Sequence, residues 1–287
     1  MLRLIPAPTA VRPQAGACVL PAPPTACVPD HLDPRVAQGL HELFPGLHHV
    51  ACRQAHAAIR LETAAGPAES YRLRIAPDGI AIAAPDAAGF FYALQTLRQI
   101  RAQGGAALPC CEIEDAPAWP LRGYYLDVSR GRVPRLELLK RRVRLLASLK
   151  INHLQLYFEH SFRFRFDPAI AGDGDAYDAD DLKALDAFCR EHFIELVPSF
   201  TCFGHLGRIL SLPPYRHLAE VEFPAPSWEA ATWLQRLRGC TIHTRDPAAQ
   251  DLLRRILDEF LPCFTSPRFN LCGDETYDLG RRTPDAT

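Results

Sequence analysis

The sequence predicts an α/β protein in which a small α+β domain, residues 1–117, precedes a series of parallel βα units in residues 118–287. Two observations predict this order. Apolar residues recur at helical spacing in some segments and form short β-like runs in others, and the two kinds of segment alternate regularly only after Pro120. The chain has 287 residues, of which 48% are hydrophobic, so it has ample material for a buried core.

The first domain opens with a Pro- and Ala-rich lead-in over residues 1–30, for which we expect extended chain and one short strand near residues 18–20. Helical periodicity predicts two helices, over residues 31–44 and 87–103. Short β-like runs predict three strands, at residues 58–61, 71–75 and 80–82. The turn Pro77-Asp78-Gly79 joins the last two strands as a hairpin, and residues 112–120 are expected to be the linker.

The second domain alternates strands and helices. The predicted strands lie at residues 123–128, 153–158, 194–200 and 269–272. The predicted helices lie at residues 134–149, 180–192 and 248–261. Alternation at this spacing is typical of right-handed βαβ units, which build a parallel sheet.

Composition narrows the class of function. A formal net charge of -1 provides no single-sign field for holding nucleic acid or an anionic membrane, so a neutral substrate is expected. The N-terminus lacks the apolar run of a secretory signal, which favours a cytoplasmic location. The ten cysteines are then expected to be mostly buried thiols, although Cys240-x-x-His243 has the spacing of half a zinc site.

Titratable residues follow the predicted strands at four places. Because reactive groups of parallel α/β proteins gather at the carboxyl ends of strands, we expect these residues at one edge of the sheet: Asp127, Glu159-His160, the loop through His205, and Asp274-Glu275. Such a concentration suits acid/base chemistry. The alternative is that the Asp-Glu pair is a solvated loop pair and that His205 is a hydrogen-bonded loop residue.

Four stretches carry a resemblance to a known family. They are residues 122–130 (RGYYLDVSR), 151–159 (INHLQLYFE), 195–206 (ELVPSFTCFGHL) and 269–275 (FNLCGDE). They resemble the first four barrel strands of family 20 glycoside hydrolases, the exo-β-N-acetylhexosaminidases, and in particular an intracellular branch with a Tyr-x-Glu-Asp motif after the second strand. Residues 71–100 are similar to the α+β domain that precedes the barrel in that family. Here His160 stands where the motif has its second carboxylate.

The resemblance implies the first half, about four βα units, of a (β/α)8 TIM-type barrel. It also implies substrate-assisted retaining hydrolysis of a terminal β-linked N-acetylglucosamine or N-acetylgalactosamine without a cofactor or metal. Glu275 would be the general acid/base and Asp274 would hold the acetamido group, with Gly273 allowing the strand to break. The implied substrate-binding residues are Arg122, His205 and Glu159.

Several alternatives stay open from the residues alone. Arg122 could instead pair with Asp115 or Asp127, while Asp127, Arg130 and His160 are expected to be structural. The alternation of Phe162, Phe164 and Phe166 with arginines is more typical of packing on the barrel than of stacking on a sugar or a base. Another kind of barrel hydrolase with a conventional nucleophile is the weaker reading of the chemistry.

The second domain is shorter than a complete barrel. About 168 residues follow from Pro120, fewer than the roughly 250 of a typical closed barrel. We therefore expect residues 1–287 alone to lack ordinary turnover unless self-association or a complementing polypeptide closes the barrel. A truncated remnant or interaction module of the same family is the alternative to an enzyme.

Overall fold

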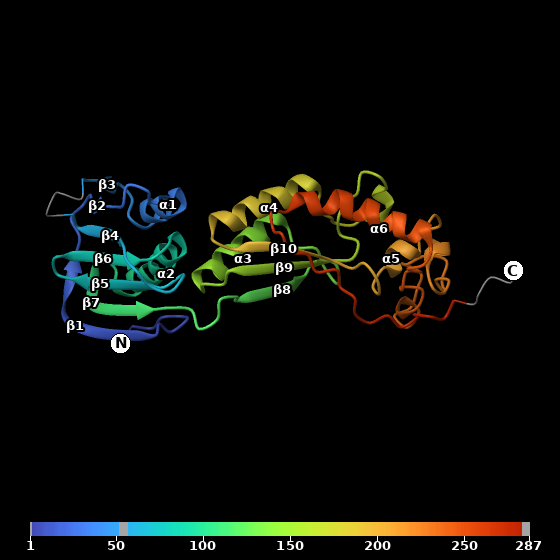
Figure 1. The fold of residues 1–287 in the computed structure, drawn as a ribbon, viewed down its shortest axis with the longest axis horizontal. Coiled ribbons are helices and arrows are strands. Elements are labelled where there is room, and N and C mark those ends of the chain that lie inside the picture. The colour runs from blue at the N-terminus through green and yellow to red at the C-terminus, as the bar shows by residue number, and fades with distance from the viewer. Residues whose placement is uncertain (1, 52–56, 283–287) are drawn as a thin grey trace. The chain divides into compact units, whose positions relative to one another are not determined.

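The computed structural model describes residues 2–51 and 57–282 (Figure 1). The chain forms two compact units. The first contains the residues up to Arg122 together with Arg144–Asn152 and Glu191–Phe193, and the second contains Gly123–Val143, His153–Arg190 and the residues from Ile194 onward. Within the described residues, no helix is both long and apolar enough to cross a membrane.

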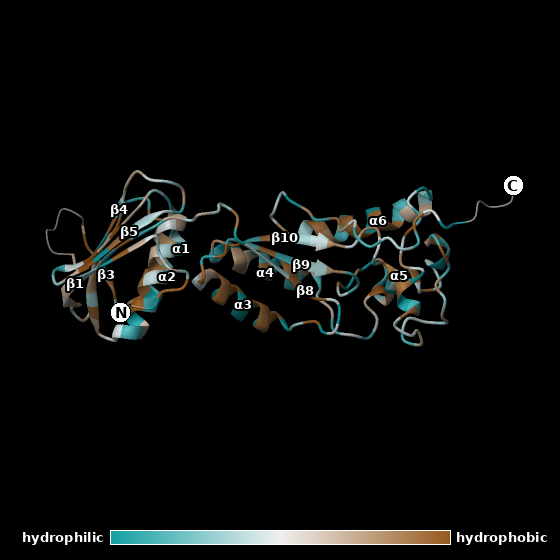
Figure 2. Ribbon diagram, turned by 90° about the horizontal axis from the view of Figure 1, so that it is seen from below, coloured by the Kyte–Doolittle hydropathy of each residue, from teal (hydrophilic) through white to brown (hydrophobic). Residues whose placement is uncertain are grey.

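The first unit is built on a mixed seven-stranded sheet in the order β1-β7-β5-β6-β4-β2-β3. The strands are β1 (Ala10–Val19), β2 (Thr25–Cys27), β3 (His48–His49), β4 (Ile59–Thr63), β5 (Tyr71–Ala76), β6 (Gly79–Ala84) and β7 (Ala107–Asp115). Helices α1 (Pro34–Leu43) and α2 (Ala87–Gly104) complete the unit. Hydrophobic residues run along these strands (Figure 2), and Leu73, Ile82 and Leu97 are among the fully buried side chains.

The two predicted helices and the β5–β6 hairpin of this unit are confirmed. Two expectations were wrong. The lead-in contains the ten-residue strand β1, and residues 112–115, expected in the linker, belong to β7. These two strands pair antiparallel with each other, and β1 is an edge strand that tolerates Pro13 next to a break in register.

The second unit contains a parallel sheet of β8 (Gly123–Asp127), β9 (His153–Phe158) and β10 (Glu195–Phe200), with β9 in the middle. The alternating helices are α3 (Leu136–Ser148), which continues into the first unit, α4 (Ala179–Glu191) and α6 (Pro247–Phe260). One face of the sheet packs on α6, because Phe260 meets Phe158 and Phe200 edge to face. For three of the four predicted strands and for all three predicted helices of this unit, the expected bounds are confirmed to within two residues at each end.

The predicted fourth strand is present only as a short parallel bridge. Asn270 pairs with Ser199, and the amide of Phe200 donates to the Asn270 carbonyl (3.1 Å). The segment between β10 and α6 is long and mostly irregular, with the short helices α5 (Gly207–Leu210), η2 (Arg216–Leu218) and η3 (Gln235–Leu237). This segment begins at the carboxyl end of β10. The chain after Leu271 continues from the bridge at Asn270 to the same edge of the sheet, and the candidate site lies at this edge.

Candidate active site

The predicted edge of the sheet brings His205, Asp274 and Glu275 together. The Nε2 atom of His205 lies 3.2 Å from a carboxylate oxygen of Glu275 and 3.7 Å from one of Asp274. The His205 side chain is only 16% exposed, whereas those of Asp274 and Glu275 are 64% and 54% exposed. The imidazole is thus held on the protein side of the cluster, and both carboxylates are accessible from solvent.

Local backbone geometry explains how two adjacent carboxylates meet one imidazole. Successive side chains of a strand point in opposite directions. Cys272 (φ 52°) and Glu275 (φ 49°) both adopt the left-handed conformation, which ends the regular alternation. Gly273 is not among the residues with positive φ, so the expected break at Gly273 is corrected to breaks on either side of it.

Backbone contacts of the loop after β10 fix the position of His205 beside the two carboxylates. The amide of His205 donates to the hydroxyl of the buried Thr201 (3.2 Å). The preceding residue, Gly204, lies so close to the backbone of Asp274 that a Cβ atom there would overlap the Asp274 carbonyl oxygen. Gly204 therefore allows the histidine loop and the carboxylate segment to touch through their backbones.

Glu159, at the end of β9, is a buried carboxyl group with several partners. Its pKa is raised above the ordinary value because burial penalises the charged form. The Tyr157 hydroxyl donates to its Oε1 atom (2.9 Å), and its backbone amide donates to the Ser129 hydroxyl (2.8 Å). The charge of His205 also acts on Glu159, which connects this carboxyl group electrostatically to the exposed cluster.

Arg130 is the functional candidate that the sequence reading passed over as structural. Its Nε atom lies 2.5 Å from a carboxylate oxygen of Asp127 and 3.6 Å from one of Glu159, and its guanidinium lies over the Tyr157 ring (5.1 Å). The other Asp127 oxygen accepts the amides of Ser129 and Arg130 (both 2.9 Å). The available signal was its position three residues after the end of β8, at the same edge as Glu159.

Arg122 is not brought to this edge, and its expected position there is corrected. It precedes Gly123, the first residue of β8, and therefore lies at the amino end of the strand. Its guanidinium pairs with Glu69 (2.7 Å) and donates to the carbonyls of Lys150 (2.7 Å) and Trp119 (2.9 Å), all within the first unit. Neither expected ionic alternative is its partner, and Asp115 pairs instead with Lys150 (2.6 Å).

His160 follows Glu159 but does not act as its cationic partner. Burial, reinforced by the charge of Arg208, lowers the pKa of His160 to about 4. Its Nδ1 atom lies 4.0 Å from Glu159 and has no hydrogen-bond partner. At neutral pH the ring is therefore uncharged, and the short separation between the two side chains is not an ion pair.

The alternating aromatic segment has the packing role that was favoured from the sequence. Phe162 and Phe164 are fully buried and pack against each other (ring centroids 4.8 Å apart). Phe162 also meets Phe260 of α6 (5.4 Å). Phe162 and Phe164 therefore belong to the core of the second unit, while Phe166 is half-buried beside Phe164 (5.2 Å).

Metal-ligand geometry occurs at the same cluster. Among the described residues, His205, Asp274 and Glu275 form the one group of three His, Cys or carboxylate ligands whose atoms lie within 4.8 Å of one another. One nitrogen and two oxygens suit a divalent cation as well as proton transfer. Cys240 and His243 do not form such a group: the Cys240 thiol contacts the Leu237 carbonyl (3.5 Å), and His243 Nδ1 lies 3.2 Å from Glu220.

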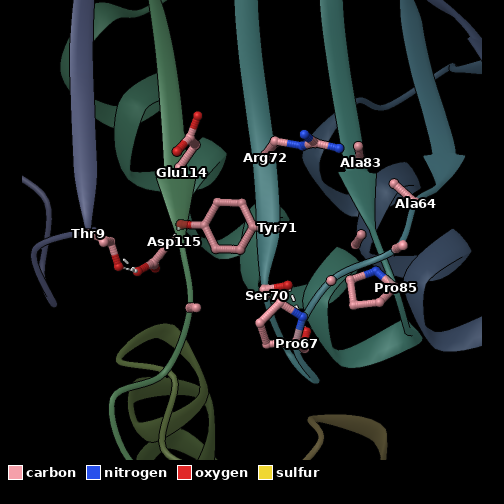
Figure 3. Close-up of a pocket in the computed structure, with 14 residues that line it drawn as sticks. Thr9, Ala64, Pro67, Ser70, Tyr71, Arg72, Ala83, Pro85, Glu114 and Asp115 are labelled. Carbon is pink, nitrogen blue, oxygen red and sulfur yellow. Dashed lines mark hydrogen bonds between the residues drawn. The ribbon is translucent and has the colours of Figure 1, made fainter.

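A separate cavity of about 330 Å³ lies at one end of the sheet in the first unit (Figure 3). None of the predicted site residues lines it. Small side chains such as Ala64 and Ala83 leave the space, and its polar groups bond to one another: the Thr9 amide donates to Asp115 (3.2 Å), as does the Tyr71 hydroxyl (3.1 Å). The hydrogen-bonding groups of Thr9, Tyr71 and Asp115 at this cavity are therefore occupied by one another, and the cavity does not point to a reactive site.

Comparison with known proteins identifies the family of the chain. Residues 1–116 match the profile of glycosyl hydrolase family 20, domain 2, and residues 119–280 match that of the glycosyl hydrolase family 20 catalytic domain. The chain belongs to glycosyl hydrolase family 20. The family resemblance seen in the sequence is thereby confirmed, and with it membership of a family of hydrolases.

Two curated relatives of this family 20 chain are β-hexosaminidases. That of Akkermansia muciniphila is 28% identical over 232 residues, covering 72% of this chain and 45% of the relative. That of Porphyromonas gingivalis is 27% identical over 237 residues, covering 72% and 29%. The chain therefore spans less than half the length of these two relatives.

Solved structures of the family confirm the expected fold class, a small N-terminal domain followed by the start of a TIM-type barrel. The N-acetyl-β-hexosaminidase of Streptomyces plicatus, solved in complex with Thio-NAglucal, has a TM-score of 0.79 at 25% identity and covers 97% of this chain and 60% of its own. The exo-β-N-acetylglucosaminidase of Vibrio harveyi has a TM-score of 0.80 at 20% identity, covering 98% and 48%.

Proposed function

We propose that this family 20 chain, when self-association or a complementing polypeptide closes its barrel, hydrolyses terminal, non-reducing β-linked N-acetylglucosamine or N-acetylgalactosamine with retention of configuration. The observation that carries the proposal is the convergence of the Glu275 and Asp274 carboxylates on His205, at 3.2 Å and 3.7 Å. Family membership and the β-hexosaminidase relatives support the substrate class. The β-hexosaminidase relatives are more than twice as long as the part of them that this chain matches, so the activity of a full-length protein is part of the proposal.

In this proposal Glu275 is the general acid/base. Its carboxyl group is half exposed, so a leaving oxygen and later a water molecule can both approach it. His205, whose Nε2 atom lies 3.2 Å from this carboxyl group, holds it in place from the protein side. The buried Glu159 is coupled electrostatically to His205, which acts against the rise in its pKa that burial causes.

Asp274 holds the acetamido group of the substrate. The acetamido oxygen attacks the anomeric carbon while Glu275 gives its proton to the leaving oxygen, which forms an oxazolinium ion. Asp274 accepts the acetamido N–H and stabilises the positive charge that develops. Water then attacks the anomeric carbon, Glu275 takes its proton, and the acetamido group is restored with net retention.

We propose Arg130 in place of Arg122 as the arginine that contacts hydroxyl groups of the terminal sugar. Arg130 lies at the carboxyl edge, 3.6 Å from Glu159, and its side chain remains 59% exposed. Its guanidinium has five donors in a planar array, of which the Asp127 and Glu159 contacts use only the Nε side. The remaining donors are available to sugar oxygens.

The test is release of p-nitrophenolate from two glycosides by the purified protein: the N-acetyl-β-glucosaminide, and the β-glucoside, which lacks the acetamido group. Substrate assistance predicts turnover of the first alone, and inhibition by a thiazoline that mimics the oxazolinium ion. Equal turnover of both, without thiazoline sensitivity, would indicate a conventional nucleophile. Tight thiazoline binding without any turnover would identify a chain that keeps the site and does not catalyse.

A further inference from the structure

Two histidines of the first unit meet outside the residues of the candidate site. His41 lies in the last turn of α1, and His49 is the second residue of β3. Their Nε2 atoms are 3.1 Å apart, with ring centroids separated by 5.1 Å and an angle of 64° between the rings. Both side chains are exposed, so solutes reach the pair from solvent.

This separation is compatible with two ligands of one metal ion. Zinc binds imidazole nitrogen at about 2.0–2.1 Å, and a tetrahedral angle then places two nitrogens roughly 3.3 Å apart. The two Nε2 atoms, 3.1 Å apart, need to separate by only about 0.2 Å to reach that value. Neutral imidazole is the ligand that zinc, nickel and copper ions prefer among nitrogen donors.

Both histidines are held by ordered backbone. The last turn of α1 closes through the amide of Phe44, which donates to the Leu40 carbonyl (2.8 Å). The residues on either side of His49 are bonded to the neighbouring segment, because the amide of His48 donates to Pro24 (3.0 Å) and that of Val50 donates to Ala26 (2.9 Å). A pair positioned before the ion arrives loses little entropy on binding it.

We propose that His41 and His49 form a binding site for a divalent transition-metal ion of the zinc, nickel or copper class. Among the described residues, no third His, Cys or carboxylate completes a ligand group with them. The nearby Glu42 carboxylate is engaged by Gln38 (3.2 Å) and Arg98 (3.4 Å). The bound ion joins α1 to the edge strand β3 and stabilises the first unit by linkage.

The experiment is calorimetric titration of the purified protein with Zn²⁺ and with Ni²⁺, repeated for His41→Ala, His49→Ala and the matched control His48→Ala. His48 is also exposed and adjacent in sequence, but strand alternation directs it to the opposite face of β3. All four proteins are compared in an Asp274→Asn, Glu275→Gln background, which leaves His205 without either carboxylate of the other ligand group. Melting temperatures with and without the ion are measured in parallel.

We expect His41→Ala and His49→Ala each to lower the affinity for the ion by on the order of tenfold or more, at least the loss that follows from removing an outer-shell partner of a metal. Each also removes the increase in melting temperature that the ion produces, and His48→Ala changes neither quantity. The proposal is overturned if the protein binds neither ion at millimolar concentrations. Equal losses in all three variants would overturn it as well.

Discussion

Gly204 packs directly against the backbone of Asp274, since a Cβ atom at position 204 would overlap the Asp274 carbonyl oxygen and come within 3.2 Å of that of Glu275. The loop that carries His205 and the segment that carries Asp274 and Glu275 are therefore in direct backbone contact. Because His205 follows Gly204 directly, any displacement of this contact changes the geometry of the whole cluster.

Gly204→Ala is predicted to reduce kcat by on the order of 10²-fold, the cost of a misplacement of about 1 Å at a reacting centre. Gly174→Ala is the matched control, because Gly174 is an exposed glycine of the same unit whose added Cβ would meet only the Ala171 carbonyl at 3.9 Å. Steady-state kinetics with the chromogenic glucosaminide measures both variants. Similar activity of Gly204→Ala and Gly174→Ala would show that the close contact does not position the site.

Glu275→Gln is predicted to lower kcat on alkyl glycosides by on the order of 10²-fold or more, the usual contribution of a positioned proton donor. Substrates with a good leaving group need little protonation, so their turnover should fall much less in the glycosylation step. The comparison is kcat for both substrate types in the same variant. Equal losses on both would remove Glu275 from the role of general acid.

Asp274→Asn is predicted to reduce turnover while preserving some affinity for the product sugar, because the lost interaction is strongest at the oxazolinium-like transition state. Values of kcat and KM, together with product inhibition, separate the two effects. The assignment fails if kcat stays at the wild-type value.

The two arginines are predicted to differ in what they control. Arg130→Lys should raise KM and lower kcat/KM at nearly unchanged stability, because lysine cannot reproduce the planar donor array. Arg122→Lys should lower the melting temperature with KM nearly unchanged, since Arg122 bonds Glu69 and two backbone carbonyls within the first unit. Thermal melts and kinetics of both variants decide the matter, and the reverse pattern would return the sugar-binding role to Arg122.

His160 predicts a specific acid sensitivity of stability. Its pKa falls from 6.5 to about 4 on folding because of burial, so between these values the unfolded chain binds a proton that the folded chain does not. The free energy of unfolding should therefore decrease as the pH falls through this window, by on the order of 2 kcal/mol. Urea unfolding at several pH values should show a flatter profile for His160→Asn, and parallel profiles would contradict the prediction.

Much of the fold follows from local pattern. Helical periodicity located α2, α4 and α6 to within two residues, because one apolar face of each helix must be buried whatever its partners are. Of β1 only the end near residue 18 was expected, and β7 was missed, because the pairing of these two strands is not local. Residues near position 10 pair with residues near position 114, and no local pattern records a partner so distant in sequence.

The candidate site divides in the same way. The sequence alone predicted that His205, Asp274 and Glu275 lie at one edge of the sheet together with Asp127 and Glu159, because the carboxyl ends of parallel strands share one edge. The predicted strand over residues 123–128 already places Arg122 before the strand and Arg130 after it, so the signal that Arg130 lies at that edge was also present in the sequence. Only the tertiary structure showed that Cys272 and Glu275, rather than Gly273, adopt the left-handed backbone conformation. It also showed that the Asp274 carbonyl approaches Gly204 too closely for a Cβ atom there. The contact of Gly204 with Asp274 joins segments about 70 residues apart in the sequence, and no local pattern of residue types records a contact so distant.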